Sequence, residues 1–330
     1  MNKIIITGGC GFIGSHVVEH FLKNTNWEIC ILDKLTYASR GFERIRDINA
    51  YHEDRVLLLT TDITREIPEG ILHEVRGANW LFHLAAETHV DNSILDPKPF
   101  VMSNLLGTFN ILEFVKKLPN LKGMLYMSTD EVFGPASAYD AFNEWDRYNC
   151  TNPYSATKAG AEELCLAYAN TYSLPIFIVH TMNVFGERQH PEKFIPMCIR
   201  KILRDETVTI HSDITETISG SRFYIHARNF ANAAHFLLGK FERRQKYNIV
   251  GECEIKNYVL AQTIAEIMGK KLHFEMVNFH ESRPGHDLRY ALDGSKMAAM
   301  GWRVPMTFRE SFERTIKWTL DNPRWLDWSI

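Results

Sequence analysis

Two carboxylates stand side by side in the middle of the chain, where a buried strand is expected to end. They are Asp130 and Glu131, in the stretch MSTDEVFGP at residues 127–135, directly after an apolar run. Because adjacent carboxylates repel each other, burial of this pair would raise the pKa of one member and leave one acid and one base. The pair is therefore either a solvated surface loop or a catalytic acid and base.

A glycine-rich turn near the N-terminus has the residue types that bind phosphate. The stretch IIITGGCGFIG places Gly8, Gly11 and Gly14 at the spacing Gly-x-x-Gly-x-x-Gly, between an expected strand and an expected helix. Glycine lets the backbone turn tightly and approach a pyrophosphate, which the N–H groups at the helix start then face. Asp33 ends the second expected strand, where an acid accepts from a ribose hydroxyl and repels a 2′-phosphate. A glycine turn alone is often only structural, but the strand, helix and acid together predict binding of NAD.

A tyrosine and a lysine follow the carboxylates in the stretch NPYSATKAGAEE. Tyr154 and Lys158 lie four residues apart, which puts them on one face of a helix. A phenol is only about 0.1% ionised at neutral pH, but a nearby ammonium and a nicotinamide ring favour its phenolate. The pair can then act as a base toward a hydroxyl. The pattern is common by chance, and it gains meaning because it follows a nucleotide-binding half.

Short apolar runs alternate with helix-period stretches through the first half of the chain. Strands are expected at 3–7, 28–33, 55–63, 80–85, 123–129 and 175–183, and helices at 13–23, 39–50, 64–75, 99–117 and 155–172. The strands are nearly all apolar, as in a parallel sheet that is covered on both faces. The pattern predicts an α/β fold with a Rossmann-type doubly wound sheet and a smaller C-terminal α/β substrate domain.

The regular alternation of expected strands and helices ends after residue 183, where loops rich in proline and glycine appear. We expect an NAD-binding domain over 1–183, with 225–250 returning to it. The segments 184–224 and 251–330 would form the substrate domain.

Composition excludes several classes of protein. The 330 residues are 45% hydrophobic with a net charge of −3, and basic residues are scattered, so nucleic acid is not an expected partner. The sequence has no apolar run long enough for a signal peptide or a membrane span. Its six cysteines form no CxxC pair, which argues against metal binding and favours reduced thiols in the cytoplasm.

Taken in order, the motifs resemble those of a known superfamily. The chain is similar to the extended short-chain dehydrogenases/reductases in TGGCGFIG, Asp33, HLAAETHVD, STDEVFG and YSATK. Within that superfamily, LDKLTYAS, AAETHVDNSI, STDEVFG, PYSATKAGAE and RPGHDLRYALD resemble the nucleotide-sugar 4,6-dehydratases that act on dTDP-glucose or UDP-glucose. The resemblance covers essentially the whole chain.

The resemblance implies a role for each chemical group. Tyr154 would take the proton from the sugar O4, helped by Thr129 and Lys158, while NAD accepts hydride from C4. Glu131 would remove the C5 proton and Asp130 would protonate the departing C6 hydroxyl, before hydride returns to C6. The product would be a 4-keto-6-deoxyglucose nucleotide, formed without net redox change by a hydro-lyase of the deoxysugar pathways.

Further cofactor-binding positions extend the glycine motif. The stretch TTDI at 60–63 places Asp62 and Ile63 at the expected adenine rim, although Asp62 could instead only cap the strand end. The full expected set for NAD is Gly8, Gly11, Phe12, Ile13, Gly14, Asp33, Lys34, Thr36, Asp62, Ile63, Ala85, Ala86, Tyr154 and Lys158.

The substrate positions also rest on the resemblance. Arginine suits a diphosphate because its planar fork bonds two oxygens at once. The expected substrate-binding residues are Thr88, Asn183, Lys193, Arg222, Asn257, Arg283 and His286.

Four positions depart from the family pattern. Phe223 and Asn229 stand where the family has acids, Phe133 replaces a tyrosine, and Thr88 replaces a serine. These changes bear on nucleotide preference, and the sequence does not separate dTDP-glucose from UDP-glucose because one methyl group distinguishes the bases.

Two other functions remain as alternatives. The chain could be an NAD-dependent sugar-nucleotide 4-epimerase or decarboxylase, or a non-catalytic member of the superfamily. Asp130 favours dehydration over the first, since a protonated acid is wanted only if a hydroxyl leaves. The helices at 99–117 and 155–172 match those through which superfamily members form homodimers.

Overall fold

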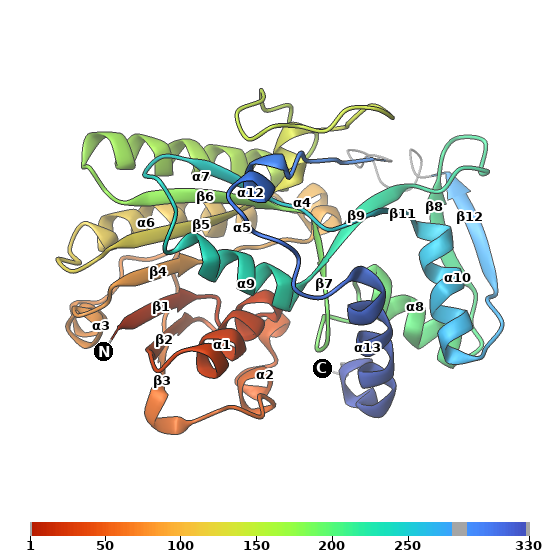
Figure 1. Ribbon diagram of the computed structural model, residues 1–330, viewed down its shortest axis with the longest axis horizontal. Coiled ribbons are helices and arrows are strands. Elements are labelled where there is room, and N and C mark those ends of the chain that lie inside the picture. Colours follow the sequence, from red (N-terminus) through yellow and green to blue (C-terminus); the bar gives the residue numbers. More distant parts are fainter. Residues whose placement is uncertain (1, 279–288, 328–330) are drawn as a thin grey trace.

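A seven-stranded parallel sheet forms the centre of the molecule in the computed structural model, which describes residues 2–278 and 289–327 (Figure 1). The strand order is β10-β6-β5-β4-β1-β2-β3, and all six neighbouring pairs are parallel. The strands are β1 (Lys3–Thr7), β2 (Glu28–Asp33), β3 (Val56–Thr60), β4 (Trp80–His83), β5 (Gly123–Thr129), β6 (Ile176–Thr181) and β10 (Lys246–Ile249). The order reverses between β1 and β4, which is the switch point at which such sheets bind ligands.

Successive side chains of each strand point to opposite faces of the sheet, and the two faces pack against two separate layers of helices. Ile4 and Ile6 of β1 face one hydrophobic core with α1 (Phe12–Asn24) and α9 (Ala227–Leu237), whereas Ile5 faces the other core. The helices of that second layer are α3 (Glu69–Val75), α6 (Gly107–Val115) and α7 (Pro153–Thr171). Both faces of the sheet are thus covered, as the apolar strands predict. The expected Rossmann-type fold class is confirmed.

Three expected helices differ from the sequence prediction, and of these the helix expected at 64–75 begins only at Glu69, the first residue of α3. The region 39–50 is helical only in α2 (Glu43–Arg46), because Arg40 and Gly41 before it adopt φ values of 53° and 62° that no right-handed helix accommodates. The region 99–117 is built from α5 (Lys98–Phe100), a π-helical stretch (Val101–Leu106) and α6. The helix α4 (Val90–Leu95) precedes them.

The rest of the chain forms a smaller layer beside the carboxyl ends of the strands (Figure 1). One sheet joins β11 (Glu254–Lys256), β9 (Ser221–His226) and β7 (Asn183–Phe185), and another joins β12 (Phe274–Asn278) to β8 (Val208–Ser212). The helices of this layer are α8 (Phe194–Leu203), α10 (Asn257–Met268) and α13 (Phe308–Asp321), whereas α12 (Ser295–Ala299) packs on the central sheet beside β10. Helices α8, α10 and α13 enclose a third hydrophobic core.

The segment 225–250 contributes α9 to the first core and β10 to the edge of the central sheet. The division into two domains at the expected boundaries stays a prediction. No helix among the described residues is long and apolar enough to cross a membrane.

Candidate active site

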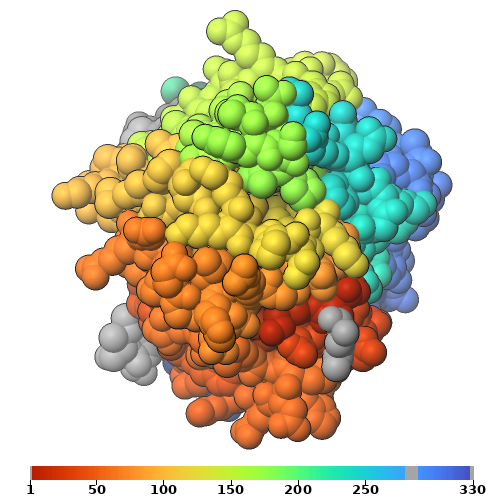
Figure 2. All heavy atoms as spheres, turned by 90° about the vertical axis from the view of Figure 1, so that its left-hand side faces the viewer, coloured from red at the N-terminus to blue at the C-terminus, as the bar shows by residue number. Residues whose placement is uncertain are grey.

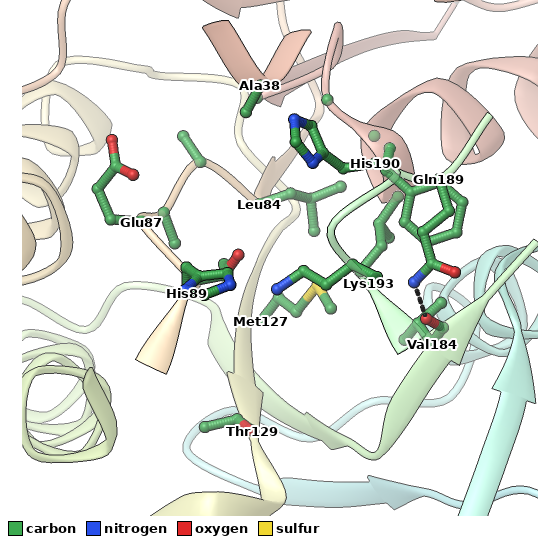
Figure 3. A pocket seen from close by; sticks show the side chains of 18 of the residues that line it. Ala38, Leu84, Glu87, His89, Met127, Thr129, Val184, Gln189, His190 and Lys193 are labelled. Atoms are coloured by element: carbon green, nitrogen blue, oxygen red, sulfur yellow. Dashed lines mark hydrogen bonds between the residues drawn. The ribbon is translucent and has the colours of Figure 1, made fainter. Parts of the chain in front are cut away.

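A cavity of about 390 Å³ opens at the carboxyl ends of the central strands. Its wall is contributed by the glycine turn after β1, by the ends of β2, β4, β5 and β6, and by the start of α7. Figure 3 shows Leu84, Met127 and Thr129 on these strand ends, with Gln189, His190 and Lys193 approaching from the other side. The cavity therefore lies between the parallel sheet and the smaller layer.

The glycine turn forms a cradle that larger residues would fill. Gly8 has a φ of 70°, and a Cβ atom there would lie 2.8 Å from the Cα of Ala85. A Cβ atom on Gly14 would lie 2.1 Å from the carbonyl oxygen of Gly8, so helix α1 packs directly on the turn. The backbone N–H of Gly11 donates to Gly8 at 3.0 Å. The turn therefore brings the start of α1 to the cavity wall, where helix N–H groups attract phosphate.

Asp33 closes the other side of this cradle at the end of β2. Its carboxylate accepts from the backbone N–H of Cys10 at 3.0 Å and from that of Leu35 at 2.8 Å. Burial raises the pKa of Asp33, and these two hydrogen bonds oppose the rise. The side chain is thus held by the turn itself, with its carboxylate at the cavity wall.

The expected NAD-binding residues gather around the same cavity. Ala85 and Ala86 follow β4, and the N–H of Ala85 is fixed by the Thr7 hydroxyl at 3.2 Å. Asp62 lies outside the lining, but its carboxylate is 3.8 Å from the Lys34 ammonium. The lining includes Gly8, Gly11, Phe12, Ile13, Gly14, Asp33, Lys34, Thr36, Ile63, Ala85, Ala86 and Tyr154, but not Lys158.

The carboxylate pair faces the cavity from the end of β5. Asp130 is 5% exposed, and its Oδ1 accepts from the Thr129 hydroxyl at 3.0 Å. Its Oδ2 is buried without a hydrogen-bond partner among the described residues. Glu131 accepts from the amide of Asn152 at 3.1 Å. The solvated-loop alternative is therefore wrong for Asp130, and the two acids have unequal surroundings.

The pKa values of both acids are raised toward neutrality. Burial raises the pKa of Asp130 to about 6, against the hydrogen bond from Thr129 and the charge of Arg222. Burial and the charge of Asp130 raise the pKa of Glu131 to about 7, against Asn152, Arg222 and Lys193. Because the groups interact, these values describe the pair, which shares one proton near neutral pH.

Tyr154 lines the cavity at the start of α7, one turn before Lys158. Burial raises the pKa of the Tyr154 phenol well above its ordinary value, as does the charge of Glu131, while a hydrogen bond with Thr129 opposes the rise. Burial lowers the pKa of Lys158 to about 8. The Lys158 ammonium donates to the carbonyl of Met127 at 2.7 Å, which ties the helix to β5.

The expected substrate residues divide into three groups. Thr88, Asn183 and Lys193 line the cavity, and Figure 3 shows Lys193 pointing toward the side on which Glu87 and His89 lie. Arg222 lies outside the lining with its guanidinium 4.8 Å from the ring of Tyr290, yet its charge reaches both acids. Asn257 accepts from the hydroxyl of Tyr224, a cavity residue, at 3.1 Å. The other two, Arg283 and His286, lie outside the described residues.

Three of the four departures from the family pattern lie behind the cavity wall, whereas Thr88 lines the cavity. Asn229 is buried and donates to the carbonyl of Met306 at 2.8 Å. Phe133 is buried and stacks on Phe142 at 5.5 Å, and Phe223 packs against the same cluster. None of these three side chains lines the cavity.

Sequence reasoning missed one residue that joins the two chemical motifs. Asn152 caps α7 by accepting from the Ser155 N–H at 2.8 Å, and its amide donates to Glu131. An asparagine directly before proline is a helix-start signal, so the sequence held a sign of this cap. The contact with Glu131 depends on the tertiary fold.

Comparisons with known proteins place this arrangement in a family. Residues 4–250 match the model of the NAD dependent epimerase/dehydratase family. The dTDP-glucose 4,6-dehydratase of Salmonella typhimurium is 34% identical, and the alignment covers 98% of this chain and 94% of that protein. A trifunctional UDP-glucose 4,6-dehydratase/UDP-4-keto-6-deoxy-D-glucose 3,5-epimerase/UDP-4-keto-L-rhamnose-reductase of Arabidopsis thaliana is also 34% identical, over 98% of this chain and 48% of that protein.

A solved structure agrees with the sequence matches. The dTDP-glucose 4,6-dehydratase of Streptomyces venezuelae, crystallised with NAD bound, superposes with a TM-score of 0.89 at 30% identity. The match covers 98% of this chain and 99% of that one. The chain belongs to the NAD dependent epimerase/dehydratase family, and within it the chain is similar to the nucleotide-sugar 4,6-dehydratases.

Proposed function

We propose that this protein is a hydro-lyase that removes water from a nucleoside-diphosphate glucose and yields the 4-keto-6-deoxyglucose nucleotide. One observation carries the proposal. A cavity beside the glycine turn holds Tyr154 together with two adjacent carboxyl groups whose pKa values are raised toward neutrality. Epimerisation at C4 needs a base such as Tyr154, but it has no leaving hydroxyl for a second acid to protonate.

The residues present fit NAD as the cofactor. The cradle over Gly8 and Gly14 admits no side chain, and Asp33 presents a carboxylate where a ribose hydroxyl would lie. When bound, NAD supplies reversible hydride acceptance, which permits oxidation and reduction of the sugar without net change. Solved relatives with NAD bound support this assignment.

The chain's own groups would then move three protons. Tyr154, with Thr129 and Lys158 beside it, takes the proton from the sugar O4 as a ketone forms at C4. The ketone acidifies the hydrogen on C5, and Glu131 accepts that proton. Asp130 gives its proton to the C6 oxygen, so that water leaves from C6. Glu131 would then return a proton to C5 as hydride is returned to C6, which completes the 4-keto-6-deoxy sugar.

The unequal surroundings of the two acids support this division of roles. The Asn152 amide donates to Glu131, and a donor stabilises the ionised form that a base requires. The Oδ2 of Asp130 is buried and makes no hydrogen bond with the described residues, which favours the neutral, protonated acid. The pKa values of the two acids lie close together, at about 6 for Asp130 and about 7 for Glu131, and the proposed roles require the shared proton to be on Asp130 when the C6 hydroxyl leaves.

Cationic side chains near the acids support a diphosphate substrate. Lys193 lines the cavity and lowers the pKa of Glu131 by its charge, as does Arg222. The phosphates of a sugar nucleotide would be neutralised by these two groups, with Arg283 and His286 as further expected contacts. Relatives named for dTDP-glucose and for UDP-glucose leave both nucleotides as candidates.

We also propose a cytoplasmic homodimer. Exposed apolar side chains gather near the helices expected at the interface: Leu95 is 85% exposed, Val101 44% and Phe109 39%. Figure 2, which looks at the left-hand side of Figure 1, shows the yellow segment that includes α6 between the orange segment before it and the yellow-green segment that includes α7. Sedimentation equilibrium of the wild type and Phe109→Glu tests this, and a monomeric wild type would contradict it.

The proposed reaction is tested by product analysis. The purified protein is incubated separately with dTDP-glucose and UDP-glucose, and mass spectrometry follows loss of one water. The alkali-induced absorbance of a 4-keto sugar provides a second signal. A product of unchanged mass would indicate epimerisation, and no product from either nucleotide would refute the proposal.

A further inference from the structure

A third acid lies in the interior directly behind the catalytic motif. Glu162 is fully buried on α7, one helical turn after Lys158 and two turns after Tyr154, on the same face of the helix. Its neighbour Glu163 points to solvent. Charged residues are seldom fully buried unless they are paired, so the surroundings of Glu162 require an explanation.

Four groups from outside the helix converge on this carboxylate. The Ser128 hydroxyl at the end of β5 donates to Oε1, and the Tyr148 hydroxyl donates to Oε2. His180 of β6 approaches Oε2 at 3.0 Å, and the ammonium of Lys246 on β10 lies 3.4 Å from it. The carboxylate therefore joins α7 to three adjacent strands of the sheet.

His180 is held between two acceptor oxygens. Its Nε2 faces Glu162, and its Nδ1 lies 2.9 Å from the Asn248 side-chain oxygen. The orientation of the Asn248 amide is set because its nitrogen donates to the carbonyls of Phe142 and Asp293, each at 3.0 Å. Both ring nitrogens of His180 thus face acceptor oxygens, so the ring is fixed between Glu162 and Asn248.

The contact with Ser128 links this cluster to the chemistry. Ser128 directly precedes Thr129, whose hydroxyl bonds both Asp130 and the Tyr154 phenol. Lys158 donates to the carbonyl of Met127, one residue before Ser128. The end of β5 is therefore fixed to α7 by two bonds, from Glu162 to Ser128 and from Lys158 to Met127.

We propose that Glu162 is a positioning residue, which holds α7 against the ends of β5, β6 and β10 and so sets Tyr154 and Lys158 against Thr129. The inference rests on the proposed roles of Tyr154 and Lys158. Glu162 itself is two helical turns from the hydroxyl that Tyr154 would contact, so it acts through these residues and touches neither substrate nor cofactor.

The charge of Glu162 has a second effect, on Lys158. Burial lowers the pKa of Lys158, and the Glu162 carboxylate opposes this and favours the ammonium. Burial also raises the pKa of Glu162, but His180, Lys246 and Ser128 outweigh it and lower that pKa to about 2, so the counter-charge persists at neutral pH. The titratable groups around Glu162 are Tyr126, Tyr148, Cys150, Lys158, Cys165, His180 and Lys246.

The test compares Glu162→Gln with Glu163→Gln, a matched change at the exposed neighbour. Product formation is measured over a pH series with dTDP-glucose. We expect kcat of Glu162→Gln to fall about 10- to 100-fold with little change in KM, because misplaced groups slow chemistry more than binding. The alkaline limb of its pH profile should move about one unit lower, since Lys158 loses a nearby opposite charge. Glu163→Gln should match the wild type.

A second variant covers the case in which Glu162→Gln does not fold. Ser128→Ala removes only the bond to β5 and leaves the carboxylate charged. We expect a roughly 10-fold lower kcat with the alkaline limb unmoved, which separates position from charge. The inference would be overturned by a wild-type kcat in Ser128→Ala, or by a wild-type kcat and pH profile in Glu162→Gln. Either result would leave the proposed function intact. A wild-type protein that forms no ketone would overturn the proposed function as well.

Discussion

Buried carboxylates lie in two adjoining places, at the cavity wall and behind it, and their pKa values are shifted in opposite directions. Asp130 and Glu131 have few donors, and their pKa values rise to about 6 and about 7. Glu162 has four surrounding donors, and its pKa falls to about 2 although burial acts on it too. Burial alone therefore does not set the protonation of an acid. The number and charge of the donors decide whether it becomes a proton carrier or a fixed anion.

The largest expected effect is on chemistry at the cavity wall. Glu131→Gln keeps the shape of the side chain but removes the base, so we expect turnover to fall about 1000-fold. The measurement is product formation from dTDP-glucose, together with deuterium uptake at C5 in heavy water. Asp140→Asn, an exposed acid in the loop that follows, serves as the control and should keep normal turnover. Unchanged deuterium uptake in Glu131→Gln would show that another group removes the C5 proton.

The second effect is a loss of stability when the charge of Glu162 is removed. Glu162→Gln leaves His180 and Lys246 buried without their counter-charge, so we expect the free energy of unfolding to fall by about 3–5 kcal/mol. Because its folded pKa lies below the unfolded value, the stabilisation by Glu162 is present above about pH 4.5 and is lost as the pH falls toward 2. Urea unfolding across this range measures both. An equal loss in Glu163→Gln would contradict the assignment to the buried cluster.

The third and smallest expected effect is a gain in stability. Asp130→Asn removes a buried charge that lacks adequate donors, so we expect this variant to be about 2 kcal/mol more stable than the wild type at pH 8. The folded pKa of Asp130 is raised, so the penalty is absent below the unfolded pKa near 3.8 and grows as the pH rises through about 6. Urea midpoints at pH 4 and pH 8 test this. If Asp130→Asn is less stable than the wild type at pH 8, the charge of Asp130 stabilises the fold as that of Glu162 does, and the two places do not differ.

The strands were predicted well from the sequence because strands that are buried on both faces consist of short apolar runs. Strands β1, β2 and β5 have the expected bounds, 3–7, 28–33 and 123–129. The helix expected at 39–50 is short because the left-handed conformation of Arg40 is a local feature that no hydrophobic period reveals. Backbone conformation at single residues thus limited the prediction of elements.

The site was predicted where residues follow one another along the chain and missed where the fold brings them together. Asp130, Glu131 and Tyr154 stand in contiguous motifs, whereas Glu162 looks like Glu163 in the stretch AGAEEL. The helical period places Glu162 on the face of Tyr154 and Lys158, so the sequence contained a sign of its burial. Its partner His180 lies 18 residues on, in the strand after α7, and Lys246 lies further along the chain in β10, so no short motif contains all three residues.

The division of labour within the acid pair is tested most directly by Asp130→Asn with dTDP-glucose in heavy water. Glu131 remains as the base in this variant, while the acid for the leaving hydroxyl is gone. We predict that deuterium still enters C5 while loss of water slows at least about 100-fold. Loss of water at the wild-type rate, measured by the mass of the product, would contradict the role of Asp130 and with it the central claim that the pair shares one proton for dehydration.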